Sequence, residues 1–235
     1  MSDRSDQLWS VIPRKRLAAT LMILFDGPEE KEVVLTVRSL SLRSYPGEVS
    51  LPGGKVDGSE DWWETALREA NEEIGFSTHN FNVERVVAMP AHLSRHLLFV
   101  RPCVINVTRK DGKPVRLSDI AAKLNASEVL CAFSVPLSTF LTDSFFDSEP
   151  AETVWSGSSW YFYVFGFEKN NWIFANVQDE NKISRTAVTG LTAHMLVDCA
   201  RYIYKRDPDF PHLPELGYLV GVEHALNTGQ FMSRI

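Results

Sequence analysis

The sequence predicts a fold of the α/β class, of the α+β type, in which a mixed β-sheet lies between helices. Strand-like apolar runs and segments of helical periodicity are intermingled along the chain, without strict βαβ alternation. The 235 residues, 44% of them hydrophobic, are also enough to bury a large core. We therefore expect a single domain over residues 1–235, with its core at 17–206 and a helical extension at 207–232.

Four apolar segments predict the main strands of the sheet. They cover residues 17–25, 32–38, 83–88 and 97–107. Gly27 and Pro28 predict the turn between the first two strands, and glycines and prolines punctuate a loop at 44–58. The sheet is therefore expected to begin with two strands joined by a short turn.

Residues 60–74 predict a helix, because apolar side chains recur there at helical spacing. Gly75 is expected to end it, since glycine readily adopts the left-handed backbone found after a helix. A capping box of Asp57 and Glu60, or Ser59 as the N-cap, is expected at its start. The residues expected to face the core are Trp63, Ala66, Leu67, Ala70 and Ile74.

The second half of the chain predicts further elements from the same kinds of pattern. They are a short helix at 118–124, a hairpin of strands at 160–168 and 172–177, and two closing helices at 191–205 and 214–228. Trp155 and Trp160 lie among serines and glycines. These two rings are predicted either to anchor a loop or to stack an adenine.

Charge and cysteine content exclude several classes of function. The net charge of -6 argues against a nucleic-acid polymer or an anionic membrane as partner, because both attract basic surfaces. No apolar run approaches the roughly 20 residues of a membrane span, and no secretory signal is recognisable. The three cysteines are far apart, so neither a disulfide framework nor a thiolate zinc site is expected.

The acidic charge is concentrated around the first predicted helix. Residues 57–73 contain seven acidic residues and one basic residue, so they account for the whole net charge. Glu69, Glu72 and Glu73 stand at i, i+3 and i+4, which places three carboxylates on one patch. They lie near the C-terminal end of the helix, where its dipole disfavours anions. Local helix stability therefore does not explain them.

Two interpretations of this patch remain open. Charged runs often form only a solvated helix face. A hard divalent cation such as Mg²⁺ would instead bind carboxylate oxygens and remove their repulsion. Arg68 could orient one carboxylate through a bidentate hydrogen bond, and Glu60 could join the group through Arg68. The backbone of Gly53 and Gly54, just upstream, could approach a metal or a phosphate closely.

The same residues resemble the Nudix box. Its seven fixed positions are occupied by Gly54, Glu60, Arg68, Glu69, Glu72, Glu73 and Gly75. Ala70 is smaller than the aliphatic residue usual at its position. The resemblance implies a Nudix fold and a hydrolase that uses Mg²⁺ or Mn²⁺ to cleave nucleoside diphosphates linked to another group. It also implies that Glu69, Glu72 and Glu73 are the metal ligands.

A second stretch resembles the signature of coenzyme A diphosphatases within that family. Arg38, Ser39, Arg43 and Gly47 fall in place before Pro52-Gly53-Gly54, with Leu51 in place of a phenylalanine. The resemblance implies that the substrate is coenzyme A or an acyl-coenzyme A. Arg38 and Arg43 are suited to clamp its phosphates, and the alternative is that they only pair with surface acids.

The general base is left open by these patterns, because it varies within the family. Asn125, Glu128 and Val129 resemble an Asn-Pro-x-Glu-Val motif of the same subgroup. Glu128 is therefore a candidate metal ligand or general base, or alternatively a cap of a turn. Glu69 is the other candidate base.

The sequence Ser233-Arg234-Ile235 resembles a peroxisomal Ser-Lys-Leu signal. Together with the subgroup resemblance it implies a peroxisomal import receptor as partner and a peroxisomal location, with the cytosol as the alternative. Two functional alternatives remain: a Nudix enzyme acting on another dinucleotide, such as NADH or ADP-ribose, and a non-catalytic nucleotide-binding Nudix module.

Overall fold

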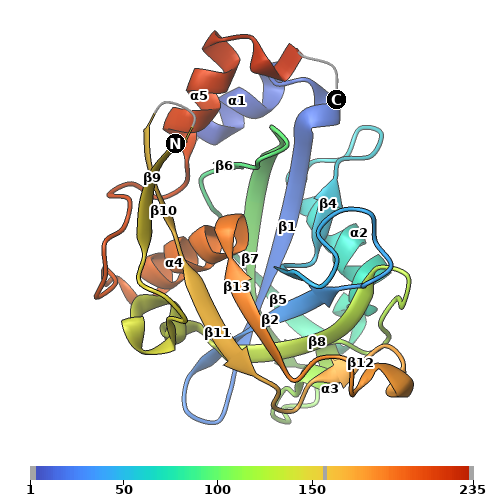
Figure 1. The fold of residues 1–235 in the computed structure, drawn as a ribbon. Helices are drawn as coiled ribbons and strands as arrows, with labels where there is room; N and C mark the ends of the chain where they lie inside the picture. The colour runs from blue at the N-terminus through green and yellow to red at the C-terminus, as the bar shows by residue number, and fades with distance from the viewer. Residues whose placement is uncertain (1–3, 156–157, 233–235) are drawn as a thin grey trace.

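The computed structural model describes residues 4–155 and 158–232, and within them nine strands form one mixed sheet (Figure 1). β1 pairs in parallel with β7 and antiparallel with β2. In spatial order the main strands are β12 (Ile173–Phe174), β8 (Val129–Pro136), β2 (Lys31–Arg38), β1 (Leu17–Asp26), β7 (Phe99–Arg109) and β5 (Phe81–Ala88). The short strands are β3 (Val49–Ser50) beside β2, β4 (Gly53–Lys55) beside β1 and β6 (His92–Leu93) beside β7.

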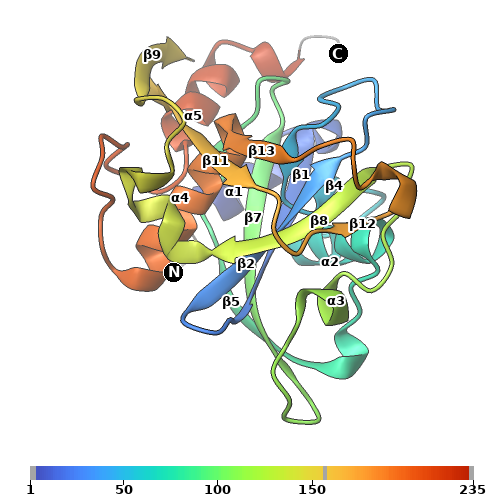
Figure 2. The ribbon, with the colours of Figure 1, turned by 60° about the horizontal axis from the view of Figure 1, so that its bottom comes forward.

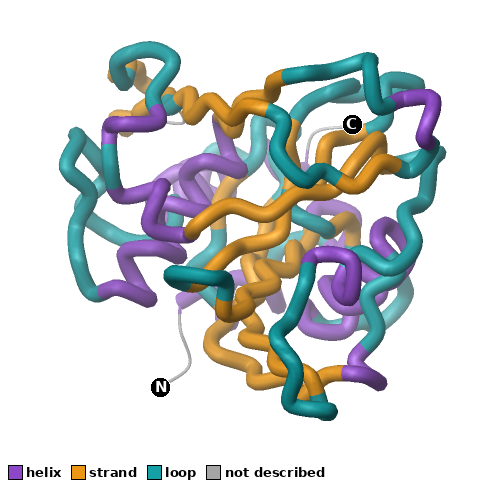
Figure 3. The backbone as a smooth tube through the Cα atoms, turned by 90° about the horizontal axis from the view of Figure 1, so that it is seen from below, coloured by secondary structure: helices purple, strands orange, loops and turns teal. Residues whose placement is uncertain are grey.

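The central strand β1 supplies side chains to two separate cores. Ala18, Met22 and Leu24 face one core, and Leu21 and Ile23 face the other, because successive side chains of a strand point to opposite sides. Helix α4 (Gly190–Tyr204) packs on the first face and helix α2 (Trp62–Ile74) on the second. Figures 2 and 3 show the strands running through the middle of the molecule between these helices. The predicted sheet between helices is therefore confirmed.

A third core closes one end of the sheet. Helix α1 (Arg4–Val11) lies beside helix α5 (Leu219–Asn227) (Figure 1), and Arg4 and Glu223 form an ion pair between them at 2.9 Å. Two further antiparallel pairs flank the sheet: β9 (Ala151–Trp155) with β10 (Ser158–Phe162), and β11 (Val164–Glu168) with β13 (Arg185–Thr189). Buried Trp160 joins the β9–β10 hairpin to the third core.

The predicted hairpin of strands 160–168 and 172–177 is wrong. The first run is divided between β10 and β11, which pair with β9 and β13, while β12 pairs with β8. Alternating apolar residues fit any of these partners equally well, so the choice is made by packing between distant segments. Strands β8, β9 and β13 and helix α1 were not predicted from the sequence.

Two helical predictions also need correction. The last helix begins at Leu219 instead of residue 214. Gly217 has a φ of 79°, outside the helical region, and its backbone N–H donates to Asp198 Oδ2 at 2.6 Å. The short helix α3 covers Leu117–Ile120, although residues 118–124 were predicted. None of the helices in the described part of the chain has the length and apolar composition needed to span a bilayer.

The start of α2 differs from the prediction, while its end agrees. Asp61 is the N-cap, and it forms a reciprocal capping box with Glu64. The predicted capping box of Asp57 and Glu60 and the alternative N-cap Ser59 are therefore wrong. Gly75 ends the helix with a φ of 68°, as expected. Of the predicted core residues, Ala66, Ala70 and Ile74 are buried, while Trp63 and Leu67 are partly buried.

Replacing Asp61 with alanine should destabilise the protein by about 1 kcal/mol, because the backbone N–H of Glu64 loses its acceptor. Urea denaturation followed by circular dichroism measures this loss. Ser59→Ala is the matched control, since Ser59 is exposed and does not cap the helix. An equal effect of the two substitutions would contradict the assigned N-cap.

Candidate functional site

The carboxylate of Glu73 is the most deeply buried acid of the predicted patch. Glu73 is 6% exposed, and its Oε2 atom has no hydrogen-bond partner among the described residues. Burial raises its pKa to about 8, and the charges of Glu69 and Glu128 add to this effect. A hydrogen bond from the Gly53 backbone and the charge of Arg38 oppose it. An orphaned, buried carboxylate oxygen of this kind is suited to a bound cation.

Gly54 lets the carboxylate of Glu69 lie directly on the backbone of β4. A Cβ atom at position 54 would clash with the carboxylate of Glu69, so a larger residue would displace that side chain from the backbone. The pairing of β4 with β1, in which Ala19 is opposite Gly54, holds this backbone in place. Burial raises the pKa of Glu69 despite its hydrogen bond from Arg68. Helix α2 and strand β4 therefore form one compact oxygen-lined corner.

Arg68 connects the carboxylates of this corner to one another. Its Nε and Nη2 donate to both oxygens of Glu60, at 2.8 and 3.1 Å. Its Nη1 donates at 2.9 Å to Glu69 Oε1 and at 2.9 Å to Glu72 Oε2. Chiefly through its hydrogen bond from Arg68, the pKa of Glu60 is lowered to about 2. The predicted bidentate contact and the link through Glu60 are both present.

The Arg68 contacts explain why the carboxylates can converge without a cation. Its guanidinium supplies the positive charge that Glu69 and Glu72 would otherwise lack. Among the described residues, no group of three or more histidine, cysteine or acidic side chains is already arranged around a metal position. The metal role of Glu69, Glu72 and Glu73 therefore stays a prediction, although their oxygens suit a hard cation.

Glu128 comes to the same corner from a distant loop. Asn125 N–H donates to the carbonyl of Glu73 at 2.9 Å, and Ser39 N–H donates to the carbonyl of Glu128 at 2.8 Å. Glu128 lies close enough for its charge to raise the pKa values of Glu69 and Glu73. Asn125 caps the turn itself, because its Oδ1 accepts from Ser127, and its Nδ2 donates to Glu128 Oε1 at 3.2 Å. Glu128 is thus placed as a further acid of the site.

The two predicted clamp arginines are placed differently. Arg38, at the end of β2, is partly buried, and its charge reaches Glu73. Its Nη2 donates only a long 3.4 Å hydrogen bond to the carbonyl of Ser44. Arg43 is exposed and forms no hydrogen bond or ion pair with other described residues, so the alternative of a paired surface arginine is not supported. The structure brings Arg38 to the carboxylates and leaves Arg43 on the adjacent loop.

Comparison with known proteins identifies the family. A model of the NUDIX domain matches residues 15–113, which include β1, β4 and α2. The chain belongs to the Nudix family. The family match ends before Glu128, so it covers the helix carboxylates and both clamp arginines but not the loop acid.

Three curated relatives have similar sequences. Nudix hydrolase 15, mitochondrial, of Arabidopsis thaliana is 35% identical over 84% of this chain and 62% of its own length. Peroxisomal coenzyme A diphosphatase 1 of Saccharomyces cerevisiae is 32% identical over 69% and 57%. Peroxisomal coenzyme A diphosphatase NUDT7 of Mus musculus is 30% identical over 76% and 66%. The chain thus spans about three fifths of the length of these Nudix relatives.

Without metal, the buried Glu73 should make stability fall as the pH rises. Its pKa is about 8 in the fold and near 4.5 in the unfolded chain, so the folded state retains a proton that the unfolded state releases. Unfolding free energy should therefore decrease from about pH 4.5 to about pH 8. Glu73→Gln should remove this decrease and be more stable than the native chain at pH 8.5, by more than about 1 kcal/mol.

Urea titrations in EDTA at pH 5 and pH 8.5 test this expectation. Glu84→Gln is the matched control, because Glu84 is an exposed glutamate on β5. A pH dependence that is the same in the native chain and in Glu73→Gln would show that Glu73 titrates normally.

Proposed function

We propose that this Nudix protein hydrolyses the diphosphate of coenzyme A and of its thioesters, using Mg²⁺ or Mn²⁺. The products are 4′-phosphopantetheine, or its acyl form, and adenosine 3′,5′-bisphosphate. The observation that carries the proposal is the convergence of Glu73, Gly54 and Glu128, from three separate segments, on one corner that Arg38 adjoins. Relatives named as coenzyme A diphosphatases support the choice of substrate.

In this proposal Glu69, Glu72 and Glu73 hold the divalent cation. All their donors are carboxylate oxygens, and Glu73 offers an oxygen that has no hydrogen-bond partner among the residues that the structure describes. A cation bound there neutralises diphosphate oxygens and lowers the pKa of a bound water. Arg68 is a positioning residue, because its Nη1 fixes one oxygen each of Glu69 and Glu72.

Two residues of the chain are placed to accept the proton of the attacking water. Glu69 lies against Gly54 with a raised pKa, which favours proton uptake. Glu128 approaches from a loop outside the helix, and Asn125 orients it through one oxygen while the other stays available. The proposal assigns the general base to one of these two carboxylates.

The phosphates of the substrate are assigned to the segment that precedes α2. Backbone groups of Gly53 and Gly54 lie beside the carboxylates, without side chains to block a phosphate. Arg38 neutralises charge next to the carboxylates, and Arg43 is exposed and has no hydrogen-bond or ion-pair partner in the described part of the chain. Coenzyme A carries a 3′-phosphate in addition to its diphosphate, and two guanidinium groups can bind both.

We further propose a peroxisomal location reached through an import receptor, with the cytosol as the alternative. The yeast and mouse relatives named above are peroxisomal by name, whereas the Arabidopsis relative is mitochondrial. The tripeptide Ser233-Arg234-Ile235 lies outside the described residues.

Glu73→Gln should abolish Mg²⁺-dependent turnover of coenzyme A while the protein stays folded. The amide keeps the size of the side chain but removes the charge that the cation needs. Phosphate-product chromatography at saturating Mg²⁺ measures the loss, which should exceed about 100-fold in kcat. Exposed Glu84→Gln serves as control. Retention of most activity would remove Glu73 from the metal site.

Arg43→Ala should weaken cleavage of coenzyme A more than cleavage of dephospho-coenzyme A, by about tenfold in kcat/KM, because only the former carries the 3′-phosphate. Arg116→Ala, another exposed arginine, is the control. The panel should include NADH and ADP-ribose. If the native chain cleaved these compounds or dephospho-coenzyme A faster than coenzyme A, the arginine clamp would be refuted. Binding of the compounds without any cleavage would indicate a non-catalytic module.

A further inference from the structure

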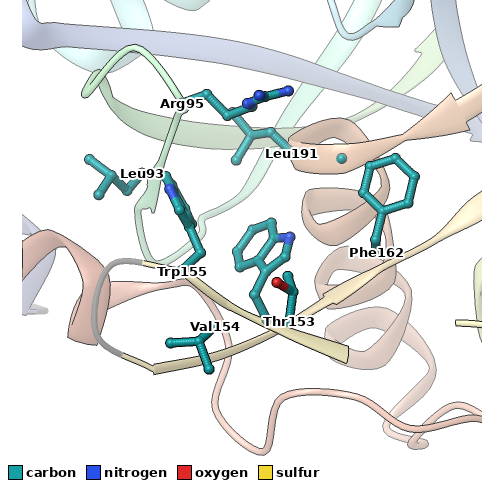
Figure 4. Close-up of a pocket in the computed structure, with 9 residues that line it drawn as sticks. Leu93, Arg95, Thr153, Val154, Trp155, Phe162 and Leu191 are labelled. Carbon is teal, nitrogen blue, oxygen red and sulfur yellow. The ribbon is translucent and has the colours of Figure 1, made fainter. Parts of the chain in front are cut away.

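A cavity of about 230 Å³ lies outside the carboxylate corner, between the β9–β10 hairpin and the start of α4. Figure 4 shows side chains from β6, the hairpin and α4 around it. One face of the hairpin carries alternate residues of its two paired strands. They are Thr153 and Trp155 of β9, and Trp160 and Phe162 of β10. Its walls are thus largely apolar, with Leu93 and Leu191 opposite the hairpin.

A second cavity, at the loop that leads to the glycine corner, adjoins this one. Arg95 lines both this cavity and a neighbouring one of about 400 Å³, whose other walls include Ser44 and Tyr45. Tyr45 OH and His96 Nε2 are 2.9 Å apart, which ties the turn bearing Arg95 to the loop. On the other wall Thr192, next to Leu191, donates to the carbonyl of Val49 at 3.2 Å. Both walls are therefore fixed to the segment that ends at Gly53.

The chemistry of the walls favours an aliphatic occupant over a nucleotide base. Trp160 already stacks on His194, with ring centres 3.6 Å apart, and Trp155 stacks on Tyr218 at 5.3 Å. One face of each ring is therefore occupied by a neighbouring ring of the protein, which agrees with the prediction that the two tryptophans anchor a loop. An alkyl chain needs no hydrogen-bonding partners and fits apolar walls. The volume exceeds the roughly 150 Å³ that accommodates a benzene ring in an engineered apolar cavity.

We propose that this cavity is the binding site for the acyl chain of a coenzyme A thioester, which rests on the function proposed above. Arg95 at the mouth is exposed and forms no hydrogen bond or ion pair with other described residues. The guanidinium of Arg95 is complementary in charge to the phosphates of an acyl-coenzyme A that extends from the cavity to the glycine corner. The cavity makes medium-chain thioesters better substrates than free coenzyme A.

Chain-length kinetics with the full-length protein and Mg²⁺ test the inference. The native chain should show kcat/KM for octanoyl-coenzyme A at least about tenfold above that for coenzyme A. Leu191→Trp fills the cavity, and Phe162→Ser removes an apolar wall that is 45% exposed. Each should lower the octanoyl-to-free ratio by about tenfold, and a ratio is insensitive to partial loss of folded protein. Val177→Trp, at a residue 85% exposed, is the matched control.

The outcomes separate this inference from the proposed function. Cleavage of coenzyme A without chain-length preference, or an unchanged ratio in Leu191→Trp, would overturn the acyl site and leave the proposed function standing. If neither compound is cleaved, the proposed function fails. Calorimetry with octanoyl-coenzyme A in EDTA then tests the acyl site by itself. Binding that Leu191→Trp abolishes and Val177→Trp retains supports the site. Absence of octanoyl-coenzyme A binding would overturn the acyl site. Loss of adenosine 3′,5′-bisphosphate binding in Leu191→Trp would also overturn it, because the cavity would then hold the nucleotide.

Discussion

The carboxylate of Glu73 is buried against the Gly53 backbone while Glu69 and Glu128 raise its pKa further. Holding like charges together in this way costs free energy, because each carboxylate loses water and repels its neighbours. Arg68 offsets part of the cost by bonding to three carboxylates at once. The remaining oxygen of Glu73 has no partner in the described chain. The corner is therefore a place where stability is sacrificed, which is typical of functional sites.

Pairing and packing on the sheet hold these carboxylates in place despite their repulsion. β4 is held on β1 by backbone pairing, and α2 is held on the same face by buried Ala66, Ala70 and Ile74. Gly54 stands where these two elements meet, and the absence of a side chain lets Glu69 reach the backbone. The position of the carboxylates thus follows from packing several residues away, so the site does not need to be stable by itself.

Local patterns were sufficient to predict the elements that carry the site. The two first strands, the helix of the acidic patch and its end at Gly75 all follow from short-range periodicity and glycine conformation. The placement of Glu128 beside Glu73 could be suspected only from a motif resemblance, because residues 74–127 separate them in sequence. The pairing of β11 with β13 and the burial of Trp160 depend on contacts between distant segments. Periodicity does not encode such partners, which is why the hairpin prediction failed.

The capping error has a related cause. Asp57, Ser59 and Asp61 are all chemically able to cap a helix, and the sequence alone ranks them almost equally. The predicted box is only half formed, because Asp57 N–H donates to Glu60 Oε2 whereas Asp57 Oδ1 accepts from the N–H of Gly58 instead of that of Glu60. The helix then begins after Asp61, and Glu64 completes the box.

Under the proposed function, the two faces of the sheet bind different parts of the substrate. α2 brings the acids to one face, whereas α4 and the β9–β10 hairpin build the apolar cavity next to the other. Both meet at the segment from Arg43 to Gly54, which pairs with β2 and β1 and begins at the exposed Arg43. A substrate with an anionic middle and an aliphatic end matches that division, because the charged and apolar parts are bound by different cores. Acyl preference could then change through α4 and the hairpin while the carboxylate corner stays the same.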